Sequence, residues 1–75
     1  MAYIITTKED GIEYILHSNN ELYWNWHYYD NVYPLRYLRK GNAERKIKKI
    51  QHRYPTYKLA VREQRDRELC KIIED

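Results

Sequence analysis

The 75-residue sequence is poor in the residue types that mark special classes of protein: it has one cysteine, two glycines, two prolines and no phenylalanine. Because Cys70 is alone, no intramolecular disulfide can form, and we expect a cytoplasmic protein. The scarcity of glycine and proline excludes a linker or a low-complexity tail. No apolar run approaches the roughly 20 residues of a membrane-spanning helix.

Aliphatic side chains are also scarce. Isoleucine, leucine and valine total 16 of the 75 residues, close to the roughly one-fifth below which chains stay disordered. Nine tyrosines and two tryptophans supply the missing apolar area, since each ring is large. We therefore expect one domain, residues 1–75, with a small core.

The first part of the chain predicts a three-stranded meander. Residues 3–8 are β-branched and aromatic, residues 12–17 alternate, and Asp10-Gly11 between them favours a hairpin turn. A third strand is expected over residues 21–29. It would place Leu22, Trp24 and Trp26 towards a covering helix, and Tyr23, His27 and Tyr29 on the opposite face.

One helix is predicted after Gly41 and before Pro55, with Asn42 as its N-cap and Glu44 in its first turn. Its apolar positions recur at helical spacing at Ala43, Ile47, Ile50 and Tyr54. Before this helix Pro34 breaks any regular element, so residues 35–38 form either a short edge strand or a loop packed on the core.

The alternation over residues 57–62 predicts a fourth strand, and residues 63–75 suit a short amphipathic helix that docks on the sheet or on another copy. The expected fold is α+β: a small antiparallel sheet packed on one helix, in the order β-β-β-α-β, with a possible short C-terminal helix.

Charge is strongly segregated along the chain. Residues 1–34 carry a net −4, residues 35–62 a net +9 and residues 63–75 a net −2. The predicted helix is the densest part, with Lys46, Lys49 and Arg53 in one row beside the apolar positions and with Arg45 and Lys48 on the other side. This face is either a solvated surface or a binding site for nucleic acid or an acidic protein patch. Tyr37, Tyr54 and Tyr57 lie near it in the sequence and are candidates for stacking on unpaired bases.

Aromatic residues concentrate in the third predicted strand. One helix can cover only one face of a sheet, so Tyr23, His27 and Tyr29 are expected on the other face, where exposed tyrosines are typical of binding surfaces. A homodimer would cover this face and enlarge a small core.

Catalysis is not indicated. The three histidines have no cysteine or carboxylate at a metal-ligand spacing, and no nucleophile motif or glycine-rich phosphate loop is present. We expect no enzyme activity, no metal and no cofactor.

The short length, the tyrosine-rich strands, the lone helix and the abundance of Lys, Asn, Ile and Tyr (29 residues against 14 for Gly, Ala, Pro and Arg) resemble small early or accessory proteins of phages of low-GC Gram-positive bacteria. This group includes sliding-clamp inhibitors and anti-CRISPR proteins. The resemblance implies a non-enzymatic inhibitor that occludes a host replication, transcription or immunity protein in the host cytoplasm. The alternative is a small basic nucleic-acid-binding module that uses the helix over residues 43–53.

Overall fold

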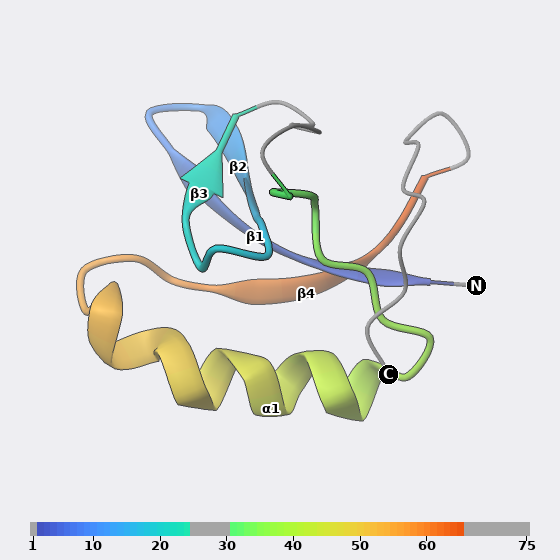
Figure 1. The fold of residues 1–75 in the computed structure, drawn as a ribbon. Coiled ribbons are helices and arrows are strands. Elements are labelled where there is room, and N and C mark those ends of the chain that lie inside the picture. Colours follow the sequence, from blue (N-terminus) through green and yellow to red (C-terminus); the bar gives the residue numbers. More distant parts are fainter. Residues whose placement is uncertain (1, 25–30, 66–75) are drawn as a thin grey trace.

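The computed structural model describes residues 2–24 and 31–65. Its elements are β1 (Tyr3–Glu9), β2 (Ile12–Leu16), β3 (Leu22–Tyr23), α1 (Lys40–Ile50), the 3₁₀ turn η1 (Gln51–Arg53) and β4 (Ala60–Glu63). The strands form one antiparallel sheet in the order β3-β2-β1-β4, and α1 lies along one side of it (Figure 1). The predicted α+β fold and its β-β-β-α-β order are confirmed.

The β1–β2 hairpin turns at Asp10 and Gly11, whose φ angles are 52° and 80°. Two successive left-handed residues match the right-handed twist of the flanking strands, and Asp and Gly tolerate this conformation. The closing pair is Glu9 with Ile12. This part of the sequence prediction is confirmed.

The third strand is shorter than predicted. β3 contains only Leu22 and Tyr23, and Trp24 is 69% exposed, so the expectation that Trp24 packs against the helix is wrong. β2 and β3 are joined by a tight turn in which Asn20 has a φ of 63°, and the strand ends where the backbone bends at Trp24. Among the described residues, the ladder between β2 and β3 contains the pairs Leu16–Leu22 and Ile15–Tyr23. Trp26, His27 and Tyr29 lie outside the described residues.

The helix begins earlier than predicted. Arg39 is the N-cap, with extended backbone and no side-chain cap, so Asn42 lies inside the first turn and Glu44 beyond it. Arg39 accepts hydrogen bonds on its carbonyl from the N–H groups of Asn42 and Ala43, at 3.1 and 3.4 Å. Backbone bonding therefore starts the helix where the sequence pattern expected side-chain capping.

The fourth strand begins later in the sequence than predicted, because a turn follows the helix. The side-chain amide of Gln51 donates to the carbonyls of Tyr54 and Tyr57, at 2.8 and 2.9 Å. These bonds hold residues 54–57 as a turn, so β4 begins at Ala60 rather than at Tyr57, and it extends to Glu63. The proposed C-terminal helix lies mostly outside the described residues.

The core lies between the sheet and α1. It contains Ile5, Leu16, Leu35, Tyr37, Ala43, Ile50 and Leu59. Ile47 and Tyr54 pack against it, as the apolar spacing predicted. Leu35 and Tyr37 belong to a core-packed loop, which is joined to β1 by a single bridge between Tyr3 and Tyr37. The opposite face of the sheet is closed as well, because Ile4, Ile15 and His17 are buried.

Candidate functional site

The solvent side of α1 carries a dense group of cations. Arg45, Lys48 and Lys49 are exposed and Lys46 is half-buried. Within the described part of the chain none of these four forms an ion pair, and Glu44 is the sole acidic residue of the helix. Like charges three and four residues apart repel each other, and Glu44 is the one residue of α1 that offsets this repulsion.

Three of the cations form a row on one flank, which we call the basic stripe: Lys46, Lys49 and Arg53. At 100° per residue this flank is opposite the one that carries Lys48. Arg53, in η1, binds Glu21, which lies between β2 and β3. The stripe therefore runs along α1 and ends beside the β2–β3 turn.

The contact with Glu21 raises the pKa of Arg53, chiefly through the hydrogen bond between the two side chains. Both side chains remain about half exposed, at 48% and 46%, so solvent screens the pair and it contributes little to stability. The guanidinium is charged at every physiological pH. Its remaining donors are available to an anionic ligand.

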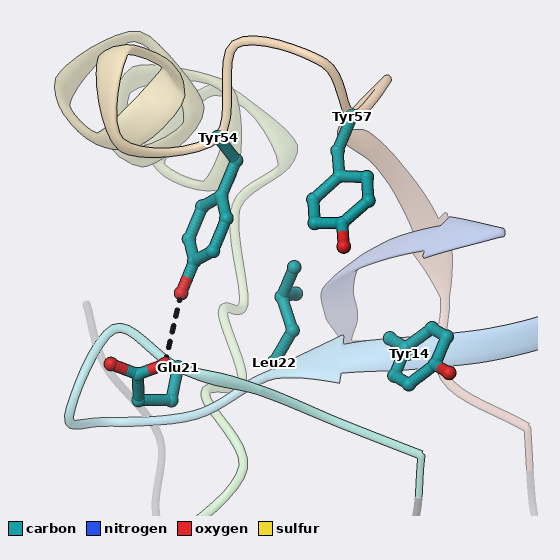
Figure 2. A pocket seen from close by; sticks show the side chains of 5 residues that line it. All are labelled: Tyr14, Glu21, Leu22, Tyr54 and Tyr57. Carbon is teal, nitrogen blue, oxygen red and sulfur yellow. Dashed lines mark hydrogen bonds between the residues drawn. The ribbon is translucent and has the colours of Figure 1, made fainter. Parts of the chain in front are cut away.

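A pocket of about 250 Å³ opens at this end of the stripe. It is lined by three tyrosines, one leucine and one carboxylate: Tyr14, Glu21, Leu22, Tyr54 and Tyr57. Figure 2 shows the tyrosine rings around Leu22, with Glu21 at one side. We call it the tyrosine pocket. It is smaller than the roughly 300–1,000 Å³ of sites for drug-sized ligands, so it suits one small group.

Hydrogen bonds fix the ring of Tyr54. Its hydroxyl donates to the carbonyl of Asn20 at 2.5 Å and lies 3.4 Å from Oε2 of Glu21, the longer contact being drawn in Figure 2. Burial raises the pKa of Tyr54 and outweighs the opposing hydrogen bond from Arg53. The ring of Tyr57 lies 5.8 Å from that of Tyr54, at an interplanar angle of 30°. These rings present flat apolar surface next to a cation.

The residues predicted from the sequence fall into separate places. Arg45, Lys46, Lys49 and Arg53 share the exposed side of α1 and η1. Tyr23 lies on the opposite face of the sheet, half-buried, where its hydroxyl accepts a hydrogen bond from Nδ2 of Asn19 at 2.9 Å and its ring meets His17 edge-on. The basic helix and the predicted tyrosine face are therefore separated by the sheet.

The prediction that Tyr37 stacks on unpaired bases is wrong, because the residue is 7% exposed and belongs to the core. Sequence reasoning missed Tyr14, Glu21 and Leu22. The alternation that puts Leu16 in the core also puts Tyr14 on the helix side. No sequence signal links Glu21 with residues 53 and 54, because only the packing of the turn against η1 brings them together.

Metal-binding clusters and membrane-spanning helices were sought among residues 2–24 and 31–65. Their His, Cys, Asp and Glu side chains form no group of three or more that is able to hold a metal ion. No helix in this part of the chain is long and apolar enough to cross a membrane.

In comparisons with protein-family models, curated proteins and solved structures, the chain matches none.

Proposed function

We propose that the protein is a non-enzymatic module that binds single-stranded nucleic acid. The observation that carries this proposal is the position of the tyrosine pocket at the end of the basic stripe. Cations that follow a phosphate backbone and aromatic rings that stack on bases are the two parts of a single-strand binding site. A duplex offers phosphates but no unstacked base.

The two parts have distinct roles. Lys46, Lys49 and Arg53 contact phosphates, and each contact releases counterions, so binding weakens with salt. The tyrosine pocket receives one unstacked base on the faces of Tyr54 and Tyr57. Glu21 and the tyrosine hydroxyls offer hydrogen-bond partners to the edge of that base. The separation of Tyr23 from this surface leaves it outside the nucleic-acid site.

Charge reversal tests the basic stripe. We expect Lys49→Glu to weaken binding of a fluorescent single-stranded oligonucleotide at least tenfold at low salt, because it removes one phosphate contact and adds repulsion. Lys8→Glu is the matched control, because Lys8 is exposed on the β1–β2 hairpin, away from α1. If both variants lost the same affinity for the oligonucleotide, the loss would come from the change in net charge alone, and the proposed site would be contradicted.

A second pair of variants tests the tyrosine pocket. Tyr57→Leu removes a ring that stacks on a base, a contact worth about 1–3 kcal/mol, whereas Tyr57→Phe keeps the ring. We expect the leucine variant to bind the oligonucleotide more weakly and the phenylalanine variant to bind nearly as well as the natural chain. Equal affinity for all three chains would contradict the role of the pocket.

A second candidate function is the occlusion of a host protein by a phage-encoded inhibitor in the host cytoplasm. The exposed Trp24, beside Tyr23 at the end of β3, favours it, because tryptophan and tyrosine dominate the energetics of protein interfaces. The basic side of α1 would then face an acidic patch. A stoichiometric partner recovered from nuclease-treated host lysate, and lost with Trp24→Ala, would support this function. Recovery unaffected by Trp24→Ala would contradict it.

A further inference from the structure

Glu21 is the one carboxylate among the described residues that line the tyrosine pocket. The other lining residues are Tyr14, Leu22, Tyr54 and Tyr57. An ionised carboxylate accepts hydrogen bonds and donates none, whereas a tyrosine hydroxyl does both. A base whose edge meets Glu21 must therefore present donors to it, and the bases differ in the donors that they carry.

The backbone of Glu21 is fixed by the turn between β2 and β3. Its N–H donates to Oδ1 of Asn19 at 3.1 Å, and its carbonyl accepts the N–H of His17 at 2.9 Å. Arg53 of η1, from a separate segment, donates to Oε1 of the side chain. The carboxylate is therefore oriented before a ligand arrives, and an oriented group loses less conformational freedom on binding than a free one.

The carboxylate of Glu21 retains acceptor capacity on both oxygens, which together offer about four lone-pair positions. Among the described residues, Arg53 occupies a position on Oε1, and the Tyr54 hydroxyl lies 3.4 Å from Oε2. That hydroxyl has a single proton, and its shorter bond, at 2.5 Å, goes to the carbonyl of Asn20. Because the Glu21 side chain is 46% exposed, a ligand is able to reach both oxygens.

The ion pair with Arg53 makes this carboxylate compatible with an anionic ligand. An acid without a partner would repel nearby phosphates. Arg53 balances the charge of Glu21 and leaves most of its lone pairs in place. Glu21 therefore presents two hydrogen-bond acceptors to the pocket without adding net negative charge.

We propose that the tyrosine pocket selects an unpaired guanine, whose N1–H and 2-amino groups donate to the two oxygens of Glu21 while the ring stacks on Tyr54 or Tyr57. The inference rests on the proposed function and specifies the base that the site prefers. Guanine alone among the common bases has two adjacent donors on its Watson–Crick edge. Adenine and cytosine have a ring-nitrogen acceptor beside the amino group, and thymine and uracil have a carbonyl on each side of their N–H. Each of these acceptors would face the carboxylate unpaired, which costs affinity.

Five oligonucleotides test the selectivity on the natural chain. Each is an oligothymidine with guanine, adenine, cytosine, thymine or inosine at one central position, and its affinity is measured by fluorescence anisotropy at low salt. We expect the guanine oligonucleotide to bind about fivefold or more tightly than those with adenine, cytosine or thymine. Inosine keeps the N1–H and lacks the 2-amino group, so its oligonucleotide should bind more weakly than the one with guanine. Equal affinities for the guanine and inosine oligonucleotides would overturn the proposal.

The same series separates the failure of this inference from the failure of the proposed function. If all five oligonucleotides bind equally well and their binding weakens with salt, the surface binds single strands without selecting guanine, and only the inference is overturned. If none of the five binds at low salt, the proposed function is contradicted and the inference falls with it.

Glu21→Gln tests the role of the carboxylate. An amide offers one acceptor and one donor, which match the amino group and the neighbouring ring nitrogen of adenine. We expect the ratio of guanine to adenine affinity to fall about fivefold or more in this variant. Glu13→Gln removes the same charge from an acid that pairs with Arg62 and does not line the pocket, so it should leave the ratio unchanged. A Glu21→Gln chain that keeps the ratio of the natural chain would contradict the proposal.

Discussion

At the scale of single residues, Tyr54 joins the fold to the candidate site. Its ring packs against the core, its hydroxyl bonds the backbone of the β2–β3 turn, and its face lines the tyrosine pocket. One side chain therefore fixes the distance between η1 and the turn that carries Glu21. Removing the hydroxyl is a test of this arrangement that leaves the ring in place.

The raised pKa of Tyr54 has a consequence for stability in alkali. The folded protein holds the phenolic proton more tightly than the unfolded chain does, because burial disfavours the phenolate. The stabilising contribution is complete below about pH 9 and is lost as the pH rises through about 10 towards the folded pKa.

Tyr54→Phe removes this titration. We expect its free energy of unfolding, measured with urea at a series of pH values, to fall less steeply above about pH 9 than that of the natural chain. The other eight tyrosines are common to both chains, so the difference isolates Tyr54. Parallel curves would show that Tyr54 is not buried as described.

At the scale of elements, α1 holds the sheet through a short apolar row. Ala43 and Ile50 are buried and Ile47 is half-buried, while the rest of the helix is polar. Because the core is small, each of these contacts is a large share of the total stability.

Ile50→Ala tests this dependence. We expect a loss of about 2–5 kcal/mol in the free energy of unfolding, since the side chain is buried and its removal leaves a cavity. Ile12→Ala deletes the same atoms at a position that is 49% exposed and should cost less than about 1 kcal/mol. Equal losses in chemical denaturation would mean that α1 is not anchored by this row.

The elements also show what the sequence was able to predict. Alternation, the Asp10-Gly11 turn and the helical spacing of apolar residues are local signals, and they predicted the meander, the helix and the order of elements correctly. Element ends depend on distant partners. The hydrogen bonds of the Gln51 side chain hold a turn that moves the start of β4 to a later residue, and the hydrogen bonds to the Arg39 carbonyl move the start of α1 to an earlier one.

The sequence predicted only part of the candidate site, because local patterns are visible in a sequence and contacts between distant residues are not. The row of cations is a local pattern and was visible in the sequence. The tyrosine pocket was not, because it joins Tyr14 and Glu21 to residues more than 30 positions away. His27 and Tyr29 remain predictions, since they lie outside the described residues.

At the scale of the whole molecule, some of the segregated charges form ion pairs between the N-terminal and the central part of the chain. Glu21 pairs with Arg53 and Glu13 pairs with Arg62, so acids of the N-terminal meander meet arginines of the basic segment. The cations of α1 have no such partners among the described residues. Positive charge is thereby concentrated on one side of the molecule, next to the tyrosine pocket.

The most direct test of the proposed function is the salt dependence of binding to a single-stranded oligonucleotide. Three phosphate contacts from the basic stripe give an expected slope of about −2 for the logarithm of the association constant against the logarithm of salt concentration. Lys49→Glu should make this slope shallower. Absence of binding at low salt, or a slope near zero, would contradict the assignment of this surface to nucleic acid.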